Sequence, residues 1–203
     1  MAAILKSLYG RLLGLDNDHR IAVGGPRLIG AGSVTPYRVP TLAYVNVAAS
    51  AAHTNTTTEA LFDKQYSIPA NTLVAGEVLR IRYQGIATAT NGTDTLTIKL
   101  YVGGLAGTAL LTGTATDVAD NNIFAGEFTL AVRTIGASGT FVGYGTHTDV
   151  PAASGTAAHS ITEIVASTAI DTTAAQVLGV GADWSVANAG NSCRLDLFMV
   201  ERM

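Results

Sequence analysis

From about residue 59 onward, apolar and polar side chains alternate along the chain with a period of two. In residues 77–85, Leu79, Ile81 and Tyr83 alternate with polar side chains, and residues 94–102 repeat this pattern. Such alternation is typical of strands with one buried and one exposed face. Asn91 and Gly92 lie between the two stretches, where a tight turn that needs positive φ would lie. The pattern therefore predicts a β-hairpin here.

Further stretches of period two follow and predict more strands. Apolar side chains share one parity in residues 124–132, 178–184 and 195–199, and Val142 and Tyr144 share one in a stretch interrupted by glycine. Together with residues 61–68, which we expect to open the domain, this makes about seven or eight strands. Clusters of Gly, Asn, Asp and Thr separate them. That spacing predicts an all-β fold, a sandwich or a barrel.

The first 58 residues lack this period. Ile4, Leu8 and Leu12 recur every four residues, which permits a short amphipathic helix, although glycines in the same stretch leave an extended arm as the alternative. Residues 23–40 are rich in Gly and Pro, which favours an irregular segment that crosses another surface. Leu42 to Val47 has the composition of a strand, and a polar linker follows it. We therefore expect a docking arm and linker over residues 1–58 and a β domain over residues 59–203.

The last predicted strand is apolar on both sides. Phe198 and Val200 lie opposite Leu197 and Met199 in a regular alternation. Either both faces are covered within one subunit, or one face is buried by a neighbouring subunit. The candidate docking and interface residues are Ile4, Leu8, Leu12, Leu28, Ile29, Tyr37, Tyr44, Phe198 and Val200.

Composition narrows the function classes. Charged residues make up 13% of the chain, about half of the ordinary share, so neighbouring molecules repel one another weakly. The net charge is −3 and no basic run is present, which argues against a nucleic-acid partner. The longest uncharged run, residues 39–58, contains Pro40 and several polar side chains and is not a membrane helix. These features favour a crowded, permanent assembly.

Motifs for catalysis, metals or cofactors are absent from the sequence. None of the four histidines has a partner at metal-ligand spacing, and His147 and Asp149 are better explained by a hydrogen bond at a loop edge. Cys193 is the only cysteine and is expected to be a small core residue. We therefore predict no catalytic, metal or cofactor residues. A carboxylate pair for glycoside cleavage stays open, because it needs only closeness in space. The available acids are Asp63, Glu77, Asp94, Glu127 and Asp183.

Four segments, residues 68–80, 93–104, 170–185 and 193–201, resemble strands of jelly-roll structural proteins from tailed bacteriophages. The resemblance covers roughly residues 59 to 203 and is one of style and strand spacing. It implies an antiparallel, jelly-roll-like β-sandwich in a virion component: a capsid decoration (cement) protein, a head fibre or a tail-fibre-like module. Such proteins are commonly trimers, and the resemblance carries no catalytic residues.

The N-terminal arm favours the first of these roles, since an extended arm gives much contact area from few residues. We therefore expect a non-enzymatic homo-oligomer, a trimer, that decorates and stabilises a capsid in the virion, after assembly in the host cytoplasm. Its partner would be the major capsid protein or another virion protein. The alternative is a tail- or head-fibre module that binds a host receptor or glycan. A low aromatic content of 6%, with Trp184 placed inward, gives an exposed sugar-stacking platform little support. A small enzyme comes third.

Overall fold

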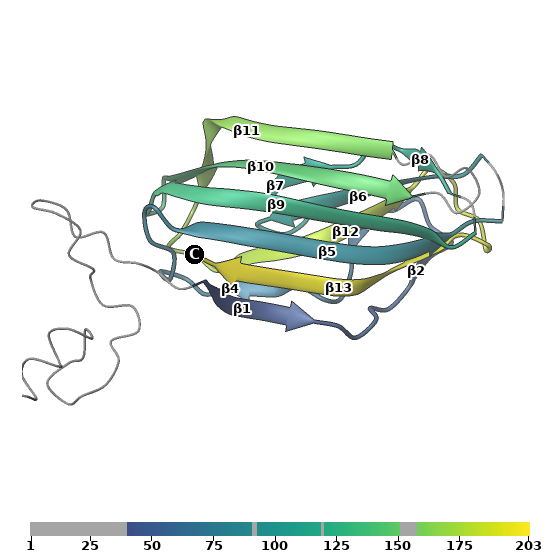
Figure 1. Ribbon diagram of the computed structural model, residues 1–203, viewed down its shortest axis with the longest axis horizontal. Helices are drawn as coiled ribbons and strands as arrows, with labels where there is room; N and C mark the ends of the chain where they lie inside the picture. The colour runs from purple at the N-terminus through teal and green to yellow at the C-terminus, as the bar shows by residue number, and fades with distance from the viewer. Residues whose placement is uncertain (1–39, 91–92, 119, 151–157) are drawn as a thin grey trace, which may run out of the picture. The chain divides into compact units, whose positions relative to one another are not determined.

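The computed structural model describes residues 40–90, 93–118, 120–150 and 158–203. Within them, two antiparallel sheets pack face to face as a β-sandwich (Figure 1), which confirms the predicted fold class. The described residues contain no helix. Ile4, Leu8, Leu12, Leu28, Ile29 and Tyr37 lie outside the described residues.

The first sheet has seven strands, in the order β1-β13-β5-β9-β10-β11, with β2 also paired to β13. All of its pairings are antiparallel, and β9, β10 and β11 pair in chain order as a meander. The bounds are β1 Thr41–Asn46, β2 His53–Thr54, β5 Val78–Thr88, β9 Asn122–Thr134, β10 Gly139–Val150, β11 Ala158–Ile170 and β13 Ser192–Arg202.

The second sheet has six strands, in the order β3-β12-β6-β7, with β4 paired to β12 and β8 to β6. Its bounds are β3 Ala60–Leu61, β4 Tyr66–Ile68, β6 Thr95–Val102, β7 Thr108–Thr112, β8 Thr116–Asp117 and β12 Gln176–Trp184. The predicted opening stretch, residues 61–68, thus contributes two short strands to this sheet.

The core lies between the sheets and follows the predicted alternation. Leu79, Ile81 and Tyr83 of β5 are buried, as are the alternate residues of β12 from Leu178 to Trp184. Each large apolar side chain removed from water in this way stabilises the fold by about 1.5–3 kcal/mol. Cys193 is 1% exposed, which confirms its prediction as a core residue. The buried layer therefore joins the two sheets into one unit.

A β-bulge in β13 changes which side chains face inward. The pairing of β13 with β5 shifts register between Leu195 and Leu197, so the alternation reverses there. Leu195, Phe198 and Val200 are all buried, and Leu197 and Met199 are left half-buried on the outer face. The expectation that Leu195, Leu197 and Met199 share one face is therefore wrong.

The predicted hairpin over residues 77–102 is also wrong. β5 belongs to the first sheet and β6 to the second, so the chain crosses between the sheets after Ala89. Both strands direct their apolar faces into the same core, and alternation cannot distinguish strands that pair from strands that face each other. Packed sheets lie only about 10 Å apart, which a short connection spans.

Residues 41–54, assigned above to the arm and linker, contribute two strands to the first sheet. β1 and β2 both pair with β13 of the same chain, and Ser50 bonds to the backbone of Leu195 between them. The strand expected over Leu42 to Val47 is therefore present, and its partner is the last strand of its own chain.

Candidate functional site

A line of hydrogen-bonded polar side chains crosses the core of the sandwich. The hydroxyl of Tyr83 on β5 lies 2.8 Å from Nδ1 of His147 on β10, and Nε2 of His147 lies 3.1 Å from Oδ2 of Asp149. Thr116 of the second sheet donates to the same Asp149 oxygen at 3.1 Å. These contacts connect the two sheets through a histidine, an aspartate and two hydroxyl groups.

Burial decides what this line can do. His147 is 0% exposed and Tyr83 is 2% exposed, so a substrate has no path to either ring. Desolvation raises the pKa of Tyr83 well above its usual value, and the nearby Asp149 charge raises it further. Tyr83 therefore stays protonated and acts as a fixed hydrogen-bond donor. The expected His147–Asp149 interaction is present, but it lies in a buried strand, not at a loop edge.

Glycines make room for these rings. A Cβ on Gly126 would lie 2.2 Å from Cζ of Tyr83, and a Cβ on Gly113 would lie 2.6 Å from Cδ2 of His147. Neither position therefore accepts a side chain while the rings keep their places. The backbone of Gly126 thus lies directly against the Tyr83 ring.

The outer face of the first sheet carries a charged cluster at its centre. Nε of Arg80 and Nε of Arg82, both on β5, donate to the two carboxylate oxygens of Glu127 on β9, at 2.7 and 2.8 Å. Burial acts to raise the pKa of Glu127, but the hydrogen bonds and charges of the two arginines outweigh it and lower that pKa. The pairing depends on the β5–β9 register, which sequence alone does not reveal.

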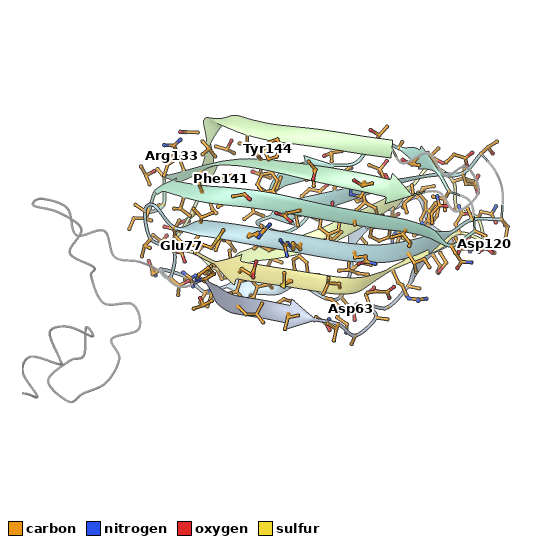
Figure 2. All side chains as sticks on the ribbon, in the orientation of Figure 1. Asp63, Glu77, Asp120, Arg133, Phe141 and Tyr144 are labelled. Atoms are coloured by element: carbon orange, nitrogen blue, oxygen red, sulfur yellow. The ribbon has the colours of Figure 1, made fainter. Side chains whose placement is uncertain are left out.

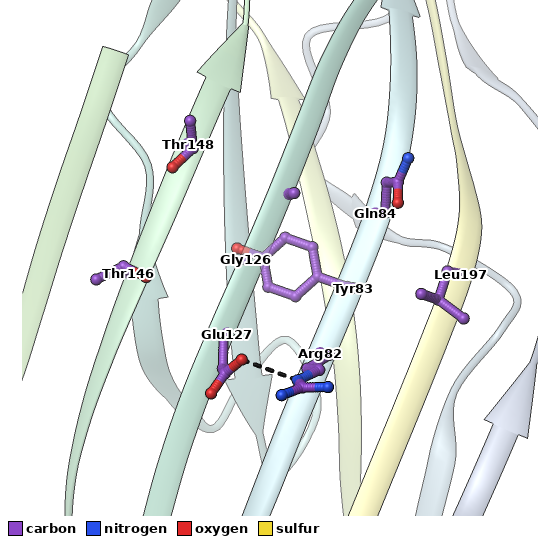
Figure 3. A pocket seen from close by; sticks show the side chains of 9 residues that line it. Arg82, Tyr83, Gln84, Gly126, Glu127, Thr146, Thr148 and Leu197 are labelled. Atoms are coloured by element: carbon purple, nitrogen blue, oxygen red, sulfur yellow. Dashed lines mark hydrogen bonds and ion pairs between the residues drawn. The ribbon is translucent and has the colours of Figure 1, made fainter. Parts of the chain in front are cut away.

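A hollow of about 310 Å³ lies beside this cluster (Figure 3). Its floor is made of the small residues Ala125 and Gly126, and the Tyr83 ring lies directly beneath Gly126. Its walls come from four strands, β5, β9, β10 and β13. They are Arg82, Gln84, Glu127, Thr146, Thr148 and Leu197. The hollow is thus a ring of mostly polar side chains around a flat, side-chain-free centre.

A second hollow of about 400 Å³ lies further along β9 and β10 on the same face. Tyr144, which is 49% exposed, and Arg133 line it, and both are labelled in Figure 2. Val142 and Ile164 give it an apolar side. Tyr144 is therefore a large aromatic ring open to solvent next to the polar hollow.

An apolar strip lies at the β1 edge of the same sheet. Leu42, Val45 and Val47 are 56%, 47% and 76% exposed. Val45 is paired with Met199 of β13, and Leu197 follows on the same face. We call these five residues the β1 strip. Contiguous apolar surface of this kind marks interaction sites in soluble proteins.

Tyr44, Phe198 and Val200 are brought together, with Phe198 and Val200 inside the molecule and Tyr44 half-buried against the core. The Tyr44 ring packs edge-on against Phe198 at 5.8 Å and stacks on Tyr66 at 5.5 Å. Phe198 and Val200 are both 0% exposed. These two residues are thus core residues and are unavailable to another subunit. The neighbouring β1 strip was missed, because the bulge that exposes Leu197 and Met199 leaves no signal in the alternation.

The outer face of the second sheet carries another ion-pair cluster. Nζ of Lys99 lies 2.8 Å from Glu59 and 3.9 Å from Asp183, and the Tyr101 hydroxyl donates to Glu59 at 2.6 Å. Burial and the Glu59 contact both raise the pKa of Tyr101. Gly179 and Gly181 leave room for residues 59–65 to lie over β12. This cluster fixes that segment onto the sheet.

The acids considered for glycoside cleavage are held by separate partners. Glu127 is bound by two arginines, Glu77 by Arg202 and the Val74 amide, and Asp94 by the Asn188 amide. The remaining two pair with lysines: Asp63 with Lys64 and Asp183 with Lys99. Within the described ranges, no group of acids, histidines and cysteines is arranged to hold a metal ion. In the same part of the chain, no helix has the length and apolar character needed to cross a membrane.

Comparison with known proteins gives no further constraint. The chain matches no protein-family model, and a search of curated proteins finds no match. The β1 strip and the two hollows, all on the outer face of the first sheet, are therefore the features from which a function has to be inferred.

Proposed function

We propose that this chain is a structural virion protein of a tailed bacteriophage, a jelly-roll-like sandwich that decorates and stabilises the capsid. It works by packing against its own copies and against the major capsid protein or another virion protein. The β1 strip is the observation that carries this proposal. The resemblance of the strand sequences to phage jelly-roll proteins supplies the kind of assembly.

The β1 strip has the properties of a contact surface. β1 is an edge strand, paired with β13 on one side, and a strand edge offers unpaired backbone groups to a second chain. Proteins that remain monomeric usually protect such an edge with charge, whereas three of the residues here are large, apolar and about half exposed or more. Burial of this strip between copies would remove an apolar patch from water without loss of ion pairs.

The position of β1 also suits a docking role for the N-terminal residues. β1 begins at Thr41, directly after the segment that carries the predicted docking residues from Ile4 to Tyr37. A chain anchored at a partner would therefore enter the sandwich at the strand that bears the apolar strip. Decoration of a shell needs such a combination of anchor and lateral contact.

Self-association is tested by light scattering during size-exclusion chromatography. We expect the 20.8 kDa chain to elute as an oligomer, a trimer by the phage resemblance, and the double variant Leu42→Ser/Val45→Ser to elute at lower mass. Val186→Ser is the matched control, because Val186 is 45% exposed but lies outside the strip. A monomeric wild type, or a double variant with unchanged mass, would argue against the β1 strip as the contact.

Capsid docking is tested with purified phage heads. We expect the full chain to co-sediment with heads that lack tails and to raise their resistance to heat. The triple variant Ile4→Ser/Leu8→Ser/Leu12→Ser should lose co-sedimentation and keep the circular dichroism spectrum of the sandwich. Recovery of the protein on tails alone would assign it to a fibre and overturn the decoration role.

A further inference from the structure

We infer that the polar hollow around Gly126 binds a saccharide unit, and that the neighbouring Tyr144 hollow receives the next part of the same ligand. This inference goes beyond the proposed role in assembly and does not depend on it. It rests on the chemistry of the walls, on the shape of the floor and on the spacing of the two hollows.

The side chains that form the walls of the hollow suit a ligand that both donates and accepts hydrogen bonds. Gln84 presents an amide with two donors and an acceptor, and Thr146 presents a hydroxyl. Glu127 accepts and Arg82 donates, and their mutual hydrogen bond of 2.8 Å fixes both side chains before a ligand arrives. Adjacent hydroxyl groups on a sugar ring match such an alternation of donors and acceptors. Inorganic anions would meet the Glu127 carboxylate and are disfavoured.

The floor and the remaining wall suit the ring itself. Ala125 and Gly126 keep the centre flat, and Leu197 offers an apolar wall for ring C–H groups. A volume of about 310 Å³ lies at the lower end for small-molecule sites, which fits one ring and not a large cofactor. A flat surface of this size, with both apolar and polar groups around it, suits a single sugar unit.

The second hollow extends the site in one direction. Tyr144, Thr146 and Thr148 are alternate residues of β10 and share its outer face. At about 3.3 Å per residue, Tyr144 and Thr148 lie about 13 Å apart along the strand. A ligand of linked sugar units therefore has a polar site at one end and an exposed aromatic ring for stacking at the other. Arg133 adds a donor beside that ring.

A second copy of this chain is the competing occupant of the face. The two hollows carry a pre-formed ion-pair cluster and open polar walls, whereas the apolar surface that a stable protein contact needs is concentrated at the β1 strip. Leu197 lies at the boundary and belongs to both, but the division of the face into a polar part and an apolar part favours different occupants for the two.

The test is a ¹H–¹⁵N NMR titration of the full chain with methyl glycosides of glucose, galactose, mannose and N-acetylglucosamine, together with a glycan array. We expect at least one saccharide to shift the amide signals of Gln84, Ala125 and Gly126, with a Kd on the order of 1 mM for a single unit at so open a site. A linked disaccharide of the same sugar should also shift Tyr144 and bind more tightly.

Two variants separate the site from the rest of the molecule. Ala125→Leu fills the hollow and should abolish the shifts, and Gln84→Ala should weaken binding at least tenfold while leaving the fold intact. Thr97→Val, on the outer face of the second sheet, is the matched control and should bind as the wild type does. The inference is overturned if no saccharide shifts these signals, if the shifts map elsewhere, or if binding survives in Ala125→Leu. It is also overturned if Ala125→Leu lowers the oligomeric mass and no saccharide binds, since the face is then a contact between copies.

Discussion

The hydroxyl oxygen of Tyr83 lies 2.8 Å from Nδ1 of His147, although 64 positions separate the two residues in the sequence. The Asp149 carboxylate faces the other ring nitrogen and only accepts, so Nδ1 is left to accept the bond that the Tyr83 hydroxyl donates. Nε2 of His147 lies 3.1 Å from Oδ2 of Asp149 and donates to that oxygen. The tautomer is thereby assigned from its partners, and every member of the line has a defined role in holding the two sheets together.

Removal of the Tyr83 hydroxyl tests this assignment. We expect Tyr83→Phe to lower the free energy of unfolding by about 1–3 kcal/mol, because Nδ1 of buried His147 would lose its donor. Urea denaturation gives the value. Tyr144→Phe is the control: Tyr144 is 49% exposed, and its loss of a hydroxyl should change stability by no more than about 0.5 kcal/mol. Equal effects of the two variants would show that the buried bond contributes nothing.

The bulge in β13 predicts opposite outcomes for two neighbouring apolar residues. Phe198→Ala should destabilise the protein by about 3–5 kcal/mol, since the side chain is fully buried and its removal leaves a cavity. Leu197→Ala should cost much less, because Leu197 is half-buried on the outer face. Thermal and urea unfolding of both variants provide the comparison. A regular strand without the bulge would reverse the order.

The two arginines that bind Glu127 predict that its carboxylate stays ionised at a lower pH than an ordinary glutamate does. Since the pKa of Glu127 is lowered in the folded protein, its ion pairs stabilise the fold at pH values above the ordinary glutamate pKa of about 4.3. That contribution is lost as the pH falls through the lowered pKa. Carbon-detected NMR titration should place the Glu127 midpoint below the ordinary value. Arg80→Gln should raise it, and Arg133→Gln, at the far end of β9, should leave it in place.

The thiol of Cys193 should be protected from modification. Burial raises its pKa to about 12, and the neighbouring Trp184 offsets only part of that effect. Little thiolate is present near neutral pH, and the sulfur is enclosed in the core. Native protein should therefore react with a thiol reagent far more slowly than protein in guanidinium chloride. Rapid labelling under native conditions would indicate that β13 opens locally.

Alternation was sufficient to predict the fold class and most of the long strands. β5, β6, β9 and β12 were predicted correctly because each buries one face, and burial of one face requires apolar and polar residues to alternate along the strand. The same requirement does not specify a neighbour, so β5 and β6 were wrongly paired although they lie in different sheets. Two-residue strands such as β3 are too short to show any period.

The outer face was harder to predict, because its features depend on register. Glu127 meets Arg80 and Arg82 across 45 to 47 positions of sequence, and only the pairing of β9 with β5 places them together. The floor of the polar hollow depends equally on a glycine and a tyrosine from different strands. The register shift between Leu195 and Leu197 turns Phe198 inward and Met199 outward. No pattern in the neighbouring sequence predicts that shift.

At Gly126, only the backbone separates the outer surface of the first sheet from the side chains of the core. On one side of that point lies the polar hollow, and on the other lies Tyr83, the first member of the line that reaches through His147 and Asp149 to Thr116 of the second sheet. Gly126 therefore lies between the outer surface and the line of hydrogen bonds that connects the two sheets. A side chain in place of Gly126 would meet the Tyr83 ring, so a change at this one residue of the hollow's floor would also disturb how the two halves of the sandwich hold together.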